Sequence, residues 1–143
     1  MTKTDNRSTG TRFERELSHT LAEHGFWVHL MQQNKAGQPA DIIAVKGKYH
    51  TLIDCKVCEN GYFSFDRIEE NQKHAMGMFS RKCGEMCYFA LRMPDGTVWM
   101  TTLNWVERLR EKGLKRIVYD ELAKHTWPLE KWLTATDTWS RDI

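Results

Sequence analysis

Asp41, Asp54 and Lys56 stand near one another in the sequence and carry side chains that suit the hydrolysis of a phosphodiester bond. Carboxylates bind divalent cations such as Mg²⁺ or Mn²⁺, which polarise a phosphoryl oxygen and generate a hydroxide nucleophile. A lysine beside them can position the attacking water or offset the charge that builds on phosphorus. These residue types indicate metal-dependent hydrolysis, provided that the fold brings them together.

The segment around these residues has the pattern of a β-hairpin. Two runs rich in β-branched residues, 41–45 and 49–57, predict two strands. The tight turn between them, residues 46–48, contains Gly47, which suits a short hairpin connection. We therefore expect the acids and the lysine to lie on one two-stranded ribbon.

This turn sets a register in which Asp41 lies directly opposite Asp54. Side chains alternate along a strand, so Lys56 shares a face with Asp54. Two carboxylates roughly 5 Å apart resist ionising together unless a cation lies between them. A surface salt bridge to Lys56 is the alternative, but it needs a polar face, and Ile43 and Leu52 on this face are apolar. The pattern favours a metal site.

A helix over residues 11–24 is predicted to bring a further acid to the hairpin. Its apolar stripe, at every fourth position, consists of Phe13, Leu17 and Leu21. Glu14 lies on the inward edge of that stripe. It is either the partner of Thr11 in a capping box or a carboxylate aimed at whatever the helix covers. The spacing alone leaves both interpretations open.

A second helix, which Asp66 would cap with Glu69 three positions later, places an amide on its apolar face. The stripe consists of Ile68, Met76 and Phe79, and Gln72 falls on it. An unpaired buried amide costs about 1–3 kcal/mol, so a core-facing Gln72 must find hydrogen-bond partners. The alternative is a glutamine at the helix edge that reaches water.

The remaining elements predict an α/β fold with a mixed β-sheet flanked by helices on both faces. The expected strands cover residues 26–31, 86–91 and 97–100, and further helices cover residues 104–112 with Asn104 as the cap and residues 128–133 from Pro128 onward. We interpret residues 1–143 as a single domain. It would comprise a flexible arm (1–10), a catalytic core (11–101) and a C-terminal helical extension (102–143).

Three tryptophans near the C-terminus are predicted to pack over the core, with base stacking or a dimer seam as alternatives. They are Trp127, Trp132 and Trp139.

Composition restricts the setting in which the protein works. The formal net charge of +2 neither requires nor excludes a nucleic-acid partner, so any basic surface must be local. Residues 1–10 lack the apolar core of a signal peptide, and no stretch approaches the roughly 20 apolar residues of a membrane span. We therefore expect a soluble cytoplasmic protein that does not interact with a membrane.

Four cysteines form two closely spaced pairs, which would also suit a zinc-stabilised interaction domain. Cys55 is bracketed by Asp54 and Lys56, so its side chain points to the opposite face of the strand. Cys87 opens an apolar run typical of a buried strand, where a free cysteine behaves as a small hydrophobe. Free thiols are favoured over zinc. The pairs are Cys55 with Cys58 and Cys83 with Cys87.

The central motif resembles that of the PD-(D/E)XK nuclease superfamily. Pro39-Ala40-Asp41 is followed after twelve residues by Asp54-Cys55-Lys56. Residues 10–14 (GTRFE) and 71–76 (NQKHAM) are similar to RecU-type Holliday junction resolvases, including phage-encoded ones. The resemblance covers about residues 8–92, and its four elements stand in the correct order.

This resemblance implies a restriction-endonuclease-like core, Mg²⁺ or Mn²⁺ as the cofactor, four-way DNA junctions as the substrate and a homodimer in a bacterial or phage-infected cell. The implied catalytic residues are Glu14, Asp41, Asp54, Lys56 and Gln72. The implied metal ligands are Glu14, Asp41, Asp54 and the backbone carbonyl of Cys55. The basic residues closest to these elements, and our candidates for DNA binding, are Arg12, Lys35 and Lys73.

Two departures from the resolvase pattern keep other functions open. Asp54 occupies a position that these resolvases usually fill with glutamate, and the turn at residues 46–48 is too short for their protruding stalk. The alternatives are a nuclease of the same superfamily that acts on flaps, ends or a specific duplex sequence, and a non-catalytic nucleic-acid-binding module. The intact set of Asp41, Asp54 and Lys56 favours an enzyme.

Overall fold

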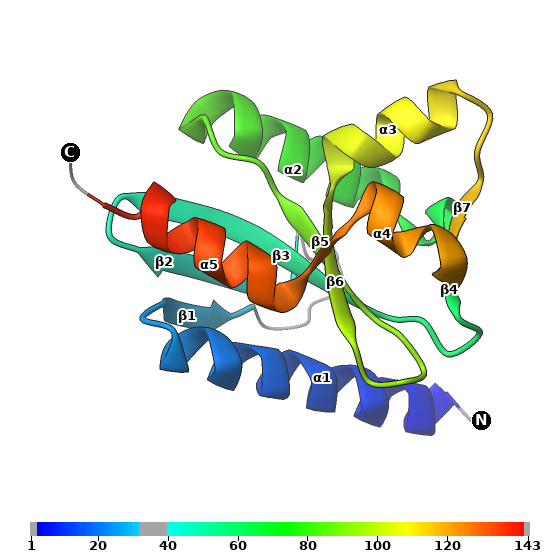
Figure 1. Ribbon diagram of the computed structural model, residues 1–143, viewed down its shortest axis with the longest axis horizontal. Helices are drawn as coiled ribbons and strands as arrows, with labels where there is room; N and C mark the ends of the chain where they lie inside the picture. Colours follow the sequence, from blue (N-terminus) through cyan, green and yellow to red (C-terminus); the bar gives the residue numbers. More distant parts are fainter. Residues whose placement is uncertain (1–2, 32–39, 142–143) are drawn as a thin grey trace.

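A computed structural model of the chain describes the backbone of residues 3–31 and 40–141 and the side chains from residue 9 onward within those ranges (Figure 1). Its helices are α1 (Lys3–Glu23), α2 (Glu70–Cys83), α3 (Leu103–Glu111), α4 (Leu122–His125) and α5 (Leu129–Trp139), with short 3-10 helices η1 (Phe65–Arg67) and η2 (Tyr119–Glu121). Its strands are β1 (Trp27–Leu30), β2 (Ile42–Lys46), β3 (Tyr49–Val57), β4 (Tyr62–Ser64), β5 (Tyr88–Arg92), β6 (Val98–Thr102), β7 (Arg116–Val118) and β8 (Trp127–Pro128).

The main sheet is mixed, as predicted. Its strand order is β1-β2-β3-β5-β6-β8, and the central pair β3–β5 is parallel whereas the other neighbours are antiparallel. Strands β4 and β7 form a separate two-stranded sheet. Figure 1 shows α1 on one side of the main sheet and α2 with α3 on the other. The prediction of an α/β fold with helices on both faces is confirmed.

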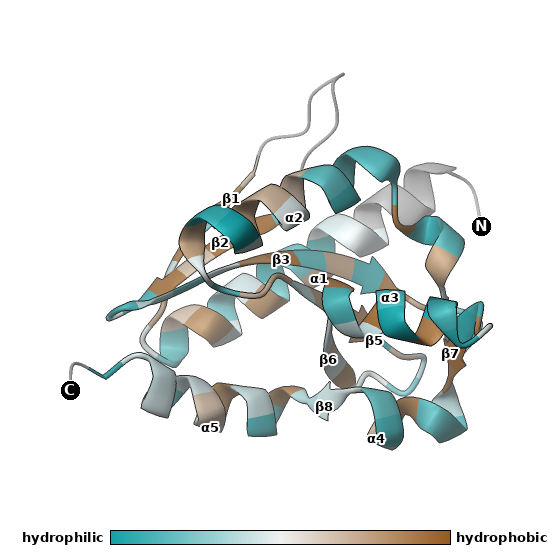
Figure 2. Cartoon of the chain, turned by 90° about the horizontal axis from the view of Figure 1, so that it is seen from above, coloured by the Kyte–Doolittle hydropathy of each residue, from teal (hydrophilic) through white to brown (hydrophobic). Residues whose placement is uncertain are grey.

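The burial of the central strand β5 on both faces explains why residues 88–91 are all apolar. Phe89 and Leu91 face a core shared with α2 and α3, whereas Tyr88 and Ala90 face a second core shared with α1 and α5. A strand that is covered on both faces needs apolar residues at every position. Figure 2 shows that the helices beside the sheet carry both apolar and polar residues.

The hairpin of β2 and β3 has the predicted register. Ile42 pairs with Ile53, and Lys46 pairs with Tyr49 across the turn. Asp41 immediately precedes β2, and its backbone N–H donates to the carbonyl oxygen of Ile53 at 3.1 Å. The same register continued by one residue brings Asp41 opposite the residue that follows Ile53.

The first helix is longer than predicted. α1 begins at Lys3, so the expected arm over residues 1–10 is wrong from Lys3 onward, and Thr11 lies inside the helix instead of capping it. The sequence-based start relied on the apolar stripe, which begins at Phe13. Once such a stripe is packed, a helix extends through neighbouring polar residues at little further cost. Residues 3–12 contain no apolar side chain, so no apolar stripe indicates that they are helical.

The second helix begins later than predicted. Asp66 belongs to η1 and accepts a hydrogen bond from the Ser64 hydroxyl at 2.6 Å, so it caps no α-helix. The chain is extended at Ile68, and α2 starts after Glu69. Phe65 and Ile68 are both buried, and placing both in the core interrupts the helix between them.

The third helix is capped by a residue other than the predicted Asn104. The Thr102 hydroxyl accepts a hydrogen bond from the backbone N–H of Trp105 at 3.1 Å, and α3 starts at Leu103. Threonine and asparagine both cap helices well, so composition did not discriminate between the two positions.

The C-terminal part is not the predicted helical extension. β7 pairs with β4 and β8 pairs with β6, while α5 continues past the expected end at residue 133 to Trp139. Strands of two or three residues are too short to produce a readable alternation. Trp132 is fully buried over the sheet, as predicted, whereas Trp127 remains half exposed. No helix in the described part of the chain is long and apolar enough to cross a membrane.

Gly47 provides a test of how the hairpin turn is packed. A Cβ atom at Gly47 would lie 2.1 Å from the backbone carbonyl oxygen of Ser140, whereas a Cβ at Gly96 would meet nothing within 4 Å. Both glycines have positive φ, which costs an alanine roughly 1–2 kcal/mol. We expect Gly47→Ala to lower the free energy of unfolding in urea clearly more than Gly96→Ala. Equal losses would contradict this close approach.

Candidate active site

Asp54 lies at the centre of a buried polar cluster on β3. Its side chain is 3% exposed, and the ammonium of Lys56, two residues along the same face, lies 2.9 Å from Oδ2. Gln72 from α2 donates from Nε2 to Oδ1 at 2.8 Å. A buried carboxylate is costly without such partners, so β3 and α2 must be aligned for this strand to fold.

Gln72 fulfils the requirement that a core-facing amide find partners. Its Nε2 donates to Asp54, and its Oε1 accepts from the backbone N–H of Glu69 at 3.3 Å and from Lys56 Nζ at 3.5 Å. The side chain is therefore fixed at both ends. The prediction that Gln72 faces inward with hydrogen-bond partners is confirmed, and the alternative of a glutamine at the helix edge is wrong.

Two supporting residues were missed by sequence reasoning. Glu69 and Gln72 form a capping box at the start of α2, which orients the glutamine amide. The spacing Glu69-x-x-Gln72 suits a capping box, but Asp66-x-x-Glu69 has the same spacing three residues earlier. The backbone carbonyl of Arg67 accepts a hydrogen bond from Lys56 Nζ at 3.2 Å. A backbone acceptor of this kind leaves no signal in a sequence.

Asp41 and Glu14 complete the cluster from the other side of the strand. Oδ2 of Asp41 accepts a hydrogen bond from the backbone N–H of Cys55 at 2.8 Å. Asp41 also lies close enough to Glu14 on α1 and to Asp54 for the three carboxyl groups to influence one another's pKa. Because Thr11 lies inside α1, Glu14 is not part of a capping box; it is a carboxyl group directed at the hairpin.

The crowded acids hold protons more strongly than isolated ones. Burial raises the pKa of Asp54 to about 7, and the charge of Asp41 adds to the rise while Lys56 opposes it. Burial likewise raises the pKa of Asp41 and of Glu14, with the Cys55 N–H partly offsetting the effect at Asp41. Neighbouring carboxyl groups also resist ionising together. Near neutral pH the cluster therefore retains protons that a cation could replace.

The cluster fits a hard divalent cation chemically, although it is not arranged as a preformed cage. Its donors are carboxylate oxygens, which Mg²⁺ and Mn²⁺ prefer. Asp54 Oδ2 is buried against the Lys56 ammonium at 2.9 Å, so a bound ion would share this oxygen with the lysine. Among residues 9–31 and 40–141, no three His, Cys, Asp or Glu side chains are poised to surround an ion. Binding therefore requires small side-chain rotations that turn the acids toward a common point.

The three predicted DNA-binding residues differ in their surroundings. Arg12 is exposed on α1. Lys73 is engaged with two carboxylates, at 3.3 Å from Glu70 and 4.0 Å from Glu107. Lys35 lies outside the described residues. The structure therefore brings Glu14, Asp41, Asp54, Lys56 and Gln72 together but not all of the predicted basic residues.

The four cysteines do not converge on one point. Cys55 packs against the core shared with α1, whereas Cys58 and Cys87 are buried in the opposite core. Cys83 is exposed at the end of α2. Burial raises the pKa of the Cys55, Cys58 and Cys87 thiols, which keeps them protonated. Their positions suit packing better than a shared zinc ion.

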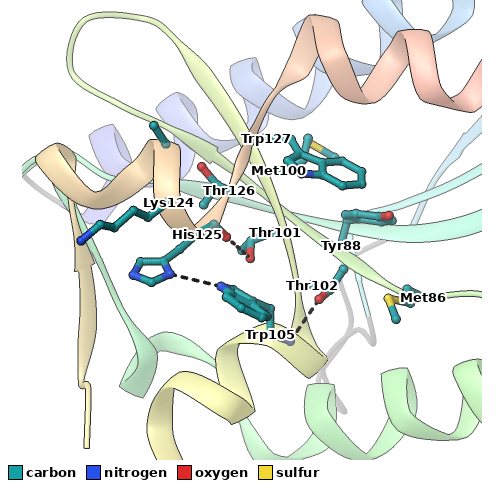
Figure 3. Close-up of a pocket in the computed structure, with 11 residues that line it drawn as sticks. Met86, Tyr88, Met100, Thr101, Thr102, Trp105, Lys124, His125, Thr126 and Trp127 are labelled. Carbon is teal, nitrogen blue, oxygen red and sulfur yellow. Dashed lines mark hydrogen bonds between the residues drawn. The ribbon is translucent and has the colours of Figure 1, made fainter. Parts of the chain in front are cut away.

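A more apolar hollow of about 380 Å³ lies away from the acids, between β6, α3 and the α4–β8 segment (Figure 3). In it Trp105 Nε1 and His125 Nδ1 are 3.3 Å apart, and the Thr101 hydroxyl donates to the His125 carbonyl at 3.2 Å. Its lining includes no carboxylate and none of the predicted site residues. We therefore assign the candidate active site to the acidic cluster and not to this hollow.

The arrangement of the cluster agrees with what known proteins indicate. The sequence matches the protein family described as archaeal Holliday junction resolvase (hjc) over residues 5–138. The chain belongs to the archaeal Holliday junction resolvase family. Members of this family are endonucleases, and resolvases of the PD-(D/E)XK superfamily generally use divalent metal ions. No curated protein matches the sequence.

A solved structure supports the same family. Hjc of Archaeoglobus fulgidus, a Holliday junction resolvase from an archaeal hyperthermophile, superposes on this chain with a TM-score of 0.64 and 25% sequence identity. The superposition covers 88% of this chain and 96% of that one. The predicted relationship to Holliday junction resolvases is confirmed. The narrower resemblance to RecU-type and phage-encoded resolvases remains a prediction, since the matched family is the archaeal one.

The raised pKa of Asp54 predicts how the stability of this resolvase-family protein depends on pH when no metal is bound. The folded chain binds the Asp54 proton more tightly than the unfolded chain. The resulting stabilisation is fully present below the ordinary value of 3.8 and is lost as pH rises through about 7. In EDTA we expect unfolding to become easier between about pH 5 and pH 8, by a few kcal/mol.

Thermal unfolding followed by circular dichroism measures this effect, with Asp54→Asn as the comparison. The variant cannot titrate at this position, so its Tm should vary less over the same pH interval. A wild-type Tm that is as high at pH 8 as at pH 5, or an equal pH dependence in Asp54→Asn, would contradict the assigned pKa shift.

Proposed function

We propose that this chain is a Mg²⁺- or Mn²⁺-dependent endonuclease that resolves four-way DNA junctions. The single observation that carries the proposal is the buried cluster of Asp54, Lys56 and Gln72 against Asp41 and Glu14, in a chain of a resolvase family. An acidic cluster with one fixed lysine has no structural need that apolar residues would not meet at lower cost. Its retention in the core is best explained by catalysis.

Each acidic residue has a proposed role in holding the metal ion. Asp41, Asp54 and Glu14 would supply carboxylate oxygens. The backbone N–H of Cys55 points toward Asp41, and since the N–H and C=O of one strand residue point to the same side, its carbonyl is available there as well. The bound ion would polarise the scissile phosphate and lower the pKa of the attacking water.

Lys56 is positioned to act on the phosphate instead of binding the metal. Its side chain is 12% exposed, and its ammonium is held between Asp54, Arg67 O and Gln72. A fixed ammonium stabilises negative charge that develops on phosphorus without having to reorganise during the reaction. Gln72 is a positioning residue, because it orients both Asp54 and Lys56 through one amide.

The substrate and assembly follow from the geometry of a four-way junction. Symmetric resolution requires cuts in two opposed strands, and each chain carries one acidic cluster. We therefore propose a homodimer with two-fold symmetry that matches the symmetry of the junction. Of the three predicted DNA-binding residues, Arg12 is the proposed phosphate contact, because it is exposed on α1 two residues before Glu14.

Cleavage assays on labelled DNA test the proposal directly. In Mg²⁺ the wild type should cut a four-way junction symmetrically and leave flap, duplex and single-stranded DNA largely intact; in EDTA it should cut none of them. Asp54→Asn and Lys56→Ala should each slow the cleavage of bound junctions at least about 100-fold, because each removes charge stabilisation in the transition state. Both variants should still bind junction DNA in gel-shift experiments.

Matched substitutions at exposed positions separate catalytic from general effects. Asp120→Asn and Lys131→Ala change the same charges on the surface and should leave cleavage unchanged. Wild-type rates in Asp54→Asn or Lys56→Ala would contradict the assigned roles. Preferential cutting of flaps or linear duplex would keep the nuclease chemistry but replace the substrate, and DNA binding without any cleavage would indicate a binding module.

A further inference from the structure

A groove made of two adjoining hollows leads away from the acidic cluster. The hollows measure about 500 and 560 Å³. They share three lining residues, Tyr62, Ser64 and Asp66, so they adjoin each other along β4 and η1. None of these shared residues was among the predicted site residues.

The first hollow opens beside the candidate active site. Cys55 and Val57, which flank Lys56 on β3, form part of its lining, and so does Arg67. The Arg67 carbonyl accepts the hydrogen bond from Lys56 Nζ, while the Arg67 guanidinium donates to the carbonyl of Val57 at 2.9 Å. Lys56 does not itself line this hollow, but Arg67 connects the lining to the lysine of the cluster.

Two of the three cations that line the second hollow have no ion-pair partner in the described part of the chain. Within the described part of the chain, neither Lys115 nor Arg116 has a carboxylate within 4.0 Å, whereas Arg110 in the same hollow is 3.6 Å from Glu107. Asp66 is the one acid of the lining, and it accepts the Ser64 hydroxyl. The hollow thus keeps a net positive charge in a protein whose total formal charge is only +2.

The small β4–β7 sheet fixes the backbone that carries these two cations. Ser64 pairs with Arg116, and the backbone N–H of Phe65 donates to the carbonyl of Lys115 at 3.0 Å. Ile117, which directly follows Arg116 on β7, is fully buried, so the alternation of the strand turns Arg116 outward. The guanidinium of Arg116 lies 4.8 Å from the centre of the Tyr62 ring, which limits its freedom further.

We infer that this groove binds the phosphodiester backbone of one DNA arm as it leaves the cleavage site, with Lys115 and Arg116 each contacting a phosphate. The inference rests on the proposed function, because it names where an arm of that substrate lies. Arg116 on β7 and Lys115 directly before it are exposed cations that complement phosphate oxygens in charge, and the guanidinium of Arg116 also matches them in geometry. The first hollow adjoins the cluster through Arg67, so a strand that leaves the active site on this side would enter it.

The inferred contacts are to the backbone, so they predict a change in salt dependence without a change in sequence preference. Each phosphate contact contributes about 0.9 to the slope of log K against log salt for duplex DNA. Replacing Lys115 and Arg116 with glutamine should therefore lower the slope by about 1.8. The affinity for junctions should fall at low salt by the same factor for arms of any sequence.

The experiment measures junction binding by fluorescence anisotropy in EDTA over a range of NaCl concentrations. The double variant Lys115→Gln/Arg116→Gln is compared with Lys82→Gln/Lys131→Gln, which removes two exposed charges from the far end of α2 and from α5. Lys115→Arg/Arg116→Lys keeps both charges and should retain the wild-type slope. Single-turnover cleavage at saturating protein should stay at the wild-type rate in the groove variant.

The possible outcomes separate the groove from the function on which it rests. Equal slopes of log K against log salt for the groove variant and its Lys82/Lys131 control would contradict the inferred phosphate contacts. A lower slope that the charge-conserving variant does not restore would also contradict them, because the loss would then be structural. If the wild type fails to cut junctions but the groove variant still shows the reduced slope, the proposed function fails and the DNA-binding groove stands.

Discussion

The fold of this protein depends on the burial of one carboxylate. Asp54 lies on β3, which pairs with β2 on one side and with β5 on the other. It is buried there, and burial strongly disfavours a charge. Lys56 and Gln72 offset that cost only if α2 lies against this face of the sheet with its first turn at Glu69. The same contacts that make the acid tolerable also fix the lysine and the amide. Stability and the geometry of the candidate site therefore have one origin.

Much of the site could be predicted because its determinants are local. A short turn sets the hairpin register, and the register alone brings Asp41 opposite Asp54. The position of Gln72 on an apolar stripe required buried partners, and Asp54 is one of them. The fold class followed from the order of apolar runs, because a two-sided strand such as β5 carries a distinctive pattern.

The remaining features depend on tertiary contacts that leave little trace in the sequence. The length of α1 could not be read, because its first residues are polar and are helical only as an extension of a packed stripe. The start of α2 depended on which of two acids capped it, and the burial of Ile68 decided the matter. The strands β7 and β8 are too short for periodicity, so the sequence predicted a helical extension where they lie.

The most direct test of the account is calorimetric titration of the metal-free protein with Mn²⁺ near pH 6, in buffers of different ionisation enthalpy. The acids hold protons before binding because their pKa values are raised. We therefore expect saturable Mn²⁺ binding with the release of about one proton or more. Asp54→Asn should lose both the binding and the proton release. Binding without proton release, or equal binding by Asp54→Asn, would contradict the claim that a cation replaces the protons of this cluster.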